Sequence, residues 1–98
     1  MRNRNRNQIS IGEYSPELKQ LDILERGASG IVAYINGGRR VVKRLLDLGI
    51  TLGTKITLQE KGIFTGPVVI SVRGSNLTLG RGIAVKIFLE IEKEENLV

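Results

Sequence analysis

Short runs in which apolar residues alternate with polar ones constrain this chain most, because such alternation is typical of strands that bury one face. Within residues 31–35, Ile, Ala and Ile alternate with Val and Tyr, and the Asn-Gly-Gly at residues 36–38 ends the run. Twelve glycines along the chain supply turns between such runs. The pattern predicts a mainly β fold of about five short strands. The later runs lie at residues 55–59, 67–72, 77–79 and 85–91.

One segment has the period of a helix, and it separates the first of these strands from the second. At 100° per residue, the apolar residues between 39 and 48 fall within an arc of about 160°. Gly49 is well placed to end this helix in the left-handed conformation. The layout as a whole predicts a small, closed or partly closed β-barrel. The residues of the apolar arc are Val41, Val42, Leu45, Leu46 and Leu48.

The chain has room for one domain, which we expect to span residues 16–92. Residues 1–15 are predicted to be a flexible basic tail, because Arg2, Arg4 and Arg6 alternate with Asn and leave no apolar face to bury. The last residues, 93–98, are predicted to be an acidic carboxyl tail.

The absence of Cys and His excludes most catalytic and metal chemistry. We therefore expect no enzyme, no catalytic residue, no cofactor and no metal site. Glu90, Glu92, Glu94 and Glu95 are interpreted as a solvated acidic cluster, since a ferrous site normally includes nitrogen or sulfur ligands. No segment has the roughly 20 apolar residues that span a bilayer, and no secretory signal is found. The sequence thus predicts a cytoplasmic protein that does not insert into membranes.

The formal net charge of +5 favours an acidic partner. Nucleic acid, an anionic membrane surface and an acidic protein face all satisfy that condition, and charge alone does not choose among them.

Two segments carry a resemblance to a known family. The sequence RLLDLGITLGT lies within residues 37–58, and GPVVISVRGSNLTLGRGIAVKIFLEI lies at residues 66–91. With their order and spacing, residues 18–91 resemble the FeoA family of small cytosolic proteins that accompany the FeoB ferrous-iron transporter. The glycines at positions 80 and 82 depart from the family pattern.

The resemblance implies an SH3-like barrel and a role as an adaptor or regulator of ferrous iron uptake. The implied partner is the cytoplasmic part of a FeoB-type transporter, and transition metal ion binding is a family-level label. The alternative is a basic small-barrel module in transcription regulation or nucleic-acid binding, as at the carboxyl end of iron-dependent repressors. Against it, no helix-turn-helix is apparent and aromatic residues for base stacking are scarce, so no specific nucleic acid is expected.

The first candidate partner-binding cluster is cationic and lies on the predicted helix. Arg39 and Arg40 fall in its first turn, where cations oppose the helix dipole, and Lys43 and Arg44 continue the charge. Free backbone amides and guanidinium groups at this point suit a carboxylate or phosphate of a partner. The alternative is that these side chains are merely solvated.

The second candidate is an apolar patch on the outward faces of the strands. Val32, Tyr34, Val69 and Phe88 occupy positions where alternation predicts polar groups. Brought together, they would suit a protein partner or a second copy of the chain. The alternative is that the leading segment covers them through Leu18, Leu21 and Ile23.

Overall fold

The computed structural model describes residues 8–92 of the 98-residue chain. These residues form seven strands, one 3-10 turn and two α-helices. The strands are β1 (Gln8–Gly12), β2 (Lys19–Gln20), β3 (Ser29–Gly38), β4 (Lys55–Lys61), β5 (Val68–Val72), β6 (Ser75–Leu79) and β7 (Ile87–Ile91). The helical elements are η1 (Leu21–Ile23), α1 (Arg39–Asp47) and α2 (Arg81–Ala84).

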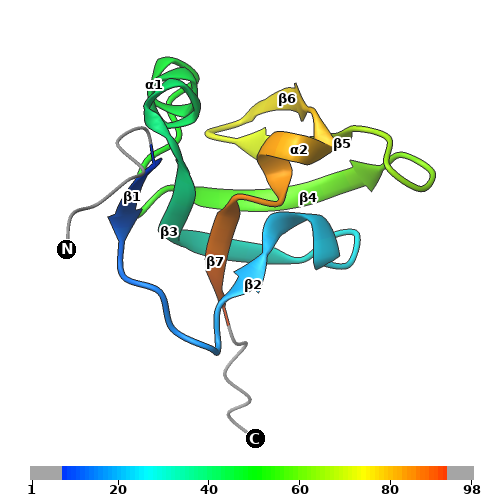
Figure 1. Cartoon of the computed structure of the whole chain (residues 1–98). Coiled ribbons are helices and arrows are strands. Elements are labelled where there is room, and N and C mark those ends of the chain that lie inside the picture. Colours follow the sequence, from blue (N-terminus) through cyan, green and yellow to red (C-terminus); the bar gives the residue numbers. More distant parts are fainter. Residues whose placement is uncertain (1–7, 93–98) are drawn as a thin grey trace, which may run out of the picture.

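All strands belong to one antiparallel sheet with the order β2-β7-β3-β4-β5-β6, and β1 pairs with β3. The sheet curls (Figure 1). In that view α1 lies at the upper left, and α2 lies near β5 and β6. The mainly β character is confirmed. The path of pairings within residues 8–92 is open, with β2 at one end and β6 at the other, so barrel closure is not part of it.

The strand count differs from the predicted five because two strands precede the first predicted one. Residues 8–12, which were expected to belong to a flexible tail, form β1 and pair with the second half of β3. Ile11 faces Ile35 in that ladder and packs against the core. This strand was not predicted because the Arg and Asn residues that precede it indicated a tail. Its pairing with β3 is made by backbone groups. Residues 1–7 of the predicted basic tail and the whole predicted acidic tail, residues 93–98, lie outside the described residues.

The glycine-rich corner before the last strand also differs from expectation. Residues 81–84 form the short helix α2 instead of a simple break, and Ala84 is buried. Val85 caps this helix, so the last strand begins at Ile87.

The core is made of Leu, Ile and Val side chains together with one Ala. On β4 and β5 the predicted alternation is observed, with Ile56, Leu58, Val68, Ile70 and Val72 buried. The remaining buried core residues are Leu21, Leu24, Val32, Ile35, Leu45, Ile50, Leu79, Ala84, Ile87 and Leu89.

Gly49 ends α1 as predicted, with φ of +83°. The Gly49 amide donates to the carbonyl of Leu46 at 2.9 Å, and the Ile50 amide donates to the carbonyl of Leu45 at 2.8 Å. This pair of bonds is the Schellman motif, and Leu45 and Ile50, both fully buried, provide its apolar contact. Only part of the predicted apolar arc is buried, since the Leu46 side chain is 52% exposed.

This difference between adjacent leucines gives a stability test. We expect Leu45→Ala to lower the free energy of unfolding by about 2–5 kcal/mol, because it leaves a cavity beneath α1. Leu46→Ala is the matched control and should change it by less than about 0.5 kcal/mol. Denaturant midpoints at constant m-value would measure both. Equal effects of the two substitutions would contradict the packing of α1 described above.

Candidate partner-binding surfaces

The predicted cationic cluster lies on α1, directly after β3. Gly38 is the N-cap residue, and no side chain caps the helix. Arg39 and Arg40 occupy the first turn, which contains no acidic residue to balance the positive end of the helix dipole. Lys43 and Arg44 follow, and all four side chains are exposed. α1 therefore presents concentrated positive charge to solvent.

Within residues 8–92, this helix has one ion pair, which weakens its positive charge only slightly. Lys43 Nζ lies 3.8 Å from an Asp47 carboxylate oxygen, and the two side chains are 76% and 66% exposed. Such solvated pairs along a helix contribute a few tenths of a kcal/mol. This ion pair therefore leaves most of the positive charge of the cluster uncompensated.

The predicted apolar patch is not a single surface. Val32 is 2% exposed and belongs to the core, so its expected outward position is wrong. The pairing of β3 with β7 shifts register between Val32 and Tyr34, which allows Val32 and Ile35 both to point inward. Val69 lies on β5, which β4 separates from β3, and its neighbours in the sheet are Glu60 and Thr78.

The other two members of the patch do lie together. Tyr34 and Phe88 face each other across β3 and β7, with ring centroids 5.4 Å apart. Tyr14, from the segment between β1 and β2, packs edge-on against both rings at 5.7 Å. We call Tyr14, Tyr34 and Phe88 the aromatic cluster.

The leading segment covers these rings differently from the predicted alternative. Leu21 is fully buried in the core and Ile23 is 55% exposed, while Tyr14 lies over Tyr34 and Phe88. Tyr14 was missed because it fell inside the predicted tail. As a result Tyr34 and Phe88 are half-buried, and Tyr14, 57% exposed, is the outermost ring.

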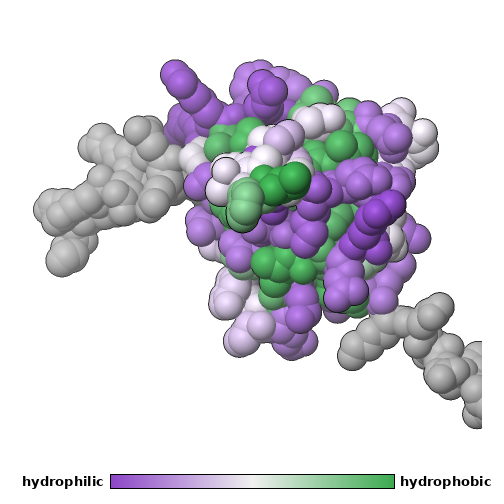
Figure 2. Space-filling model, turned by 90° about the vertical axis from the view of Figure 1, so that its right-hand side faces the viewer, coloured by the Kyte–Doolittle hydropathy of each residue, from purple (hydrophilic) through white to green (hydrophobic). Residues whose placement is uncertain are grey.

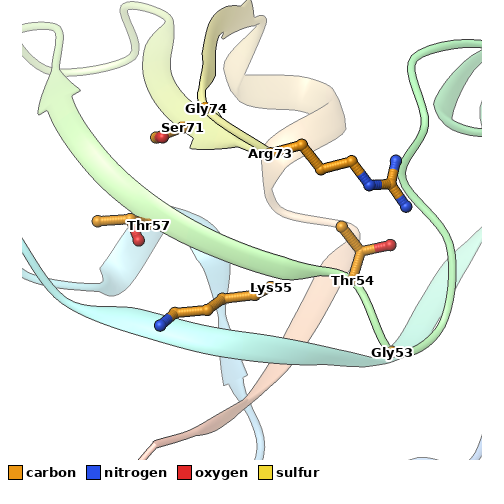
Figure 3. A pocket seen from close by; sticks show the side chains of 7 residues that line it. All are labelled: Gly53, Thr54, Lys55, Thr57, Ser71, Arg73 and Gly74. Atoms are coloured by element: carbon orange, nitrogen blue, oxygen red, sulfur yellow. The ribbon is translucent and has the colours of Figure 1, made fainter.

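A polar hollow of about 390 Å³, not predicted from the sequence, lies on the outer face of β4 and β5 (Figure 3). Its two cations extend in opposite directions in Figure 3, and each has a partner. Lys55 Nζ lies 3.4 Å from Glu92, and Arg73 Nη1 donates to the Gly49 carbonyl at 3.0 Å. The hollow therefore lacks converging charges for an anion. Its lining residues are Gly53, Thr54, Lys55, Thr57, Ser71, Arg73 and Gly74.

Residues 19–91 match the family model described as the FeoA domain. The chain belongs to the FeoA family. A curated relative from Methanocaldococcus jannaschii, "Putative Fe(2+) transport protein A", is 39% identical over 70 residues, which cover 71% of this chain and 83% of the relative. Membership in the FeoA family makes the chain a non-enzymatic accessory protein associated with ferrous iron transport, as the sequence predicted.

Solved structures agree with this assignment. A crystal structure of the iron uptake regulatory protein FeoA superposes with a TM-score of 0.71 at 31% identity, covering 76% of this chain and 99% of that one. A manganese-dependent transcriptional repressor superposes with a TM-score of 0.73, but at 21% identity and over only 44% of its own length. The second likeness shows a shared fold.

Two further observations bear on what this FeoA protein contains. Among residues 8–92, no three Asp or Glu residues gather in a group that would hold a metal ion, and the whole sequence has no His or Cys. Neither α1 nor α2 has the length and apolar character needed to cross a membrane.

The aromatic cluster can be tested by a double-mutant cycle. Tyr14→Ala and Phe88→Ala should couple by about 0.5–1.5 kcal/mol in the free energy of unfolding, because each removes one half of the same edge-to-face contact. Ile23→Ala, an exposed position outside the cluster, should be additive with Phe88→Ala to within about 0.5 kcal/mol. Coupling between Tyr14 and Phe88 no larger than in this control would mean that Tyr14 does not cover the strands in solution.

Proposed function

We propose that this FeoA protein acts in the cytoplasm, where it binds the cytoplasmic part of a FeoB-type transporter and regulates ferrous iron uptake. The observation that carries the proposal is the family match across residues 19–91, which include nearly every element of the fold. The FeoA structure with 31% identity bears the name iron uptake regulatory protein, which supports a regulatory role here.

The surface of the molecule is better suited to binding another macromolecule than to catalysis on a small molecule. Arg39 and Arg40 stand exposed at the start of α1, where an acidic protein surface would gain both their charge and the helix dipole. Exposed cations of this kind act mainly on the rate of encounter. We therefore propose that α1 steers the protein to an acidic face of the transporter.

The alternative function, a module for transcription regulation or nucleic-acid binding, is favoured only by the likeness in fold to the manganese-dependent repressor. Within residues 8–92, three strands separate α1 from α2, so these helices do not form a helix-turn-helix. Sequence-selective binding to duplex DNA at nanomolar concentration and physiological salt would favour this alternative. Weak binding with a steep salt dependence would reflect the net charge alone.

Charge reversal on α1 tests the steering role. Arg39→Glu combined with Arg40→Glu lowers the formal net charge from +5 to +1, since each reversal removes two charges. We expect association with the transporter's cytoplasmic domain to slow by about tenfold and to lose most of its salt dependence. The melting temperature should stay nearly constant, because both side chains are exposed. Stopped-flow or surface-plasmon measurements at several ionic strengths give these rates.

The matched control is Lys19→Glu combined with Lys55→Glu, which makes the same change in net charge at exposed positions outside α1 and away from the β4–β5 loop. It should slow association much less than the reversal on α1. If both pairs slow association equally, the net charge acts as a whole and α1 is not the steering surface.

A further inference from the structure

The most exposed large apolar side chains in the described part of the chain lie together on the loop between β4 and β5. Ile63 is 79% exposed and Phe64 is 90% exposed. In Figure 1 this loop projects from one end of the sheet, and the view of that end in Figure 2 shows green apolar surface standing among purple polar groups. We call Ile63 and Phe64 the apolar tip.

The loop that carries the tip is held by one arginine of α2. Arg81 donates from Nε to the carbonyl of Gly66 at 2.9 Å and from Nη2 to the carbonyl of Gly62 at 3.1 Å. Nη2 also lies 2.8 Å from the carbonyl oxygen of Phe64. Three hydrogen bonds from a single guanidinium fix the path of the loop.

Two backbone bonds complete the closure of the loop. The amide of Gly66 donates to the carbonyl of Ile63 at 3.0 Å, and the amide of Gly62 donates to the carbonyl of Pro67 at 2.8 Å. Together with Arg81, these bonds engage five of the six carbonyls of residues 62–67. The loop has therefore satisfied most of its acceptors internally, which lets its side chains enter an apolar site at low cost.

The backbone at Phe64 is unfavourable for the residue that stands there. Its φ of +57° lies in the left-handed region, which a bulky side chain adopts rarely and Gly or Asn adopts readily. Because the ring is also solvated, neither packing within this chain nor backbone preference accounts for Phe at this position.

We infer that the apolar tip is an anchor that enters an apolar pocket of a partner protein, and that this partner is the cytoplasmic part of the FeoB-type transporter. The inference rests on the proposed function. Because Arg81 already fixes the main chain at Phe64, the loop loses little backbone freedom when its ring enters a shaped pocket, as aromatic anchors at protein interfaces do.

A protein pocket fits the tip better than a lipid surface does. Fluid lipid does not require a loop whose main chain is fixed, and lipid-binding elements are usually rich in unpaired cations. Near the base of this loop the charges are mixed: Arg26 pairs with Glu60 at 3.4 Å, and Lys61 donates to the carbonyl of Asp22 at 3.3 Å.

The tip and the cationic helix are separate contacts. In Figure 1, α1 lies at the upper left and the β4–β5 loop lies at the right. An apolar anchor governs mainly the rate of dissociation and responds little to salt, whereas exposed cations govern association and respond strongly. The two surfaces are therefore distinguishable in one kinetic experiment.

Phe64→Asn tests the anchor without disturbing the loop, because Asn tolerates the left-handed backbone and the clamp from Arg81 reaches only main-chain atoms. Binding of the full chain to the transporter's cytoplasmic domain is measured by surface plasmon resonance. We expect the dissociation constant to rise roughly 30-fold, mostly through faster dissociation, with the salt dependence of association unchanged. The melting temperature should stay constant or rise.

Thr65→Asn, an exposed polar position in the same loop, is the matched control and should bind as the wild type does. Ile63→Ser is a second variant that avoids the left-handed position, and it should weaken binding in the same direction. If Phe64→Asn proves less stable than the wild type, Ile63→Ser decides the question by itself.

The outcomes separate the anchor from the proposed function. If the wild type binds and both tip variants bind equally well, the anchor is overturned and the proposed function stands. If the wild type does not bind the domain, both fall. If the variants lose affinity for phosphatidylglycerol vesicles, or lose self-association in sedimentation, while they bind the domain normally, the tip is a lipid or homotypic contact and the inference is overturned.

Discussion

The fold depends on β3, which pairs with three other strands. One edge of β3 pairs with β7, and the other edge pairs first with β4 and then with β1. On that edge the partner changes between Ile31, the last residue paired with β4, and Tyr34, the first paired with β1. The ladder with β7 on the opposite edge shifts register at the same point, between Val32 and Tyr34. Backbone bonds from Val32 to Thr54 at 2.9 Å and from Gly53 to Val32 at 2.8 Å join the turn before β4 to the same point.

The surfaces follow from this arrangement. The irregularity turns Val32 into the core and leaves Tyr34 beside Phe88, where Tyr14 covers them both. β3 then leads without a capping side chain into α1, so that cations stand at the open end of the helix. β4, which pairs with the first residues of β3, leads at its far end into the loop with the apolar tip. A non-enzymatic protein thereby has two exposed surfaces of different character, one charged and one apolar.

Much of the fold could be predicted from the sequence because it is encoded locally. The alternation in β4 and β5 and the left-handed Gly49 both report short-range rules, and both are observed. What could not be predicted depends on pairing between distant residues. Nothing in residues 8–12 signals that they pair with β3, and no alternation pattern reveals a register shift.

The same limit applies to the candidate surfaces. The cations of α1 could be predicted to lie together because the helical period of the sequence places them on one short helix. The apolar tip was missed because a loop residue is usually expected to be solvated, and its significance depends on Arg81, which lies 17 residues away from Phe64 in the chain. Likewise, Val69 was grouped with Tyr34 and Phe88 by pattern, although β4 lies between their strands.

The most direct measurement is amide hydrogen exchange of the full chain, alone and saturated with the transporter's cytoplasmic domain. We expect exchange to slow at residues 39–44 of α1 and at residues 62–66 of the β4–β5 loop. Exchange at residues 75–78, which belong to the edge strand β6, should stay the same. Protection confined to β6 or to the polar hollow, with α1 and the loop unchanged, would contradict both proposed contacts.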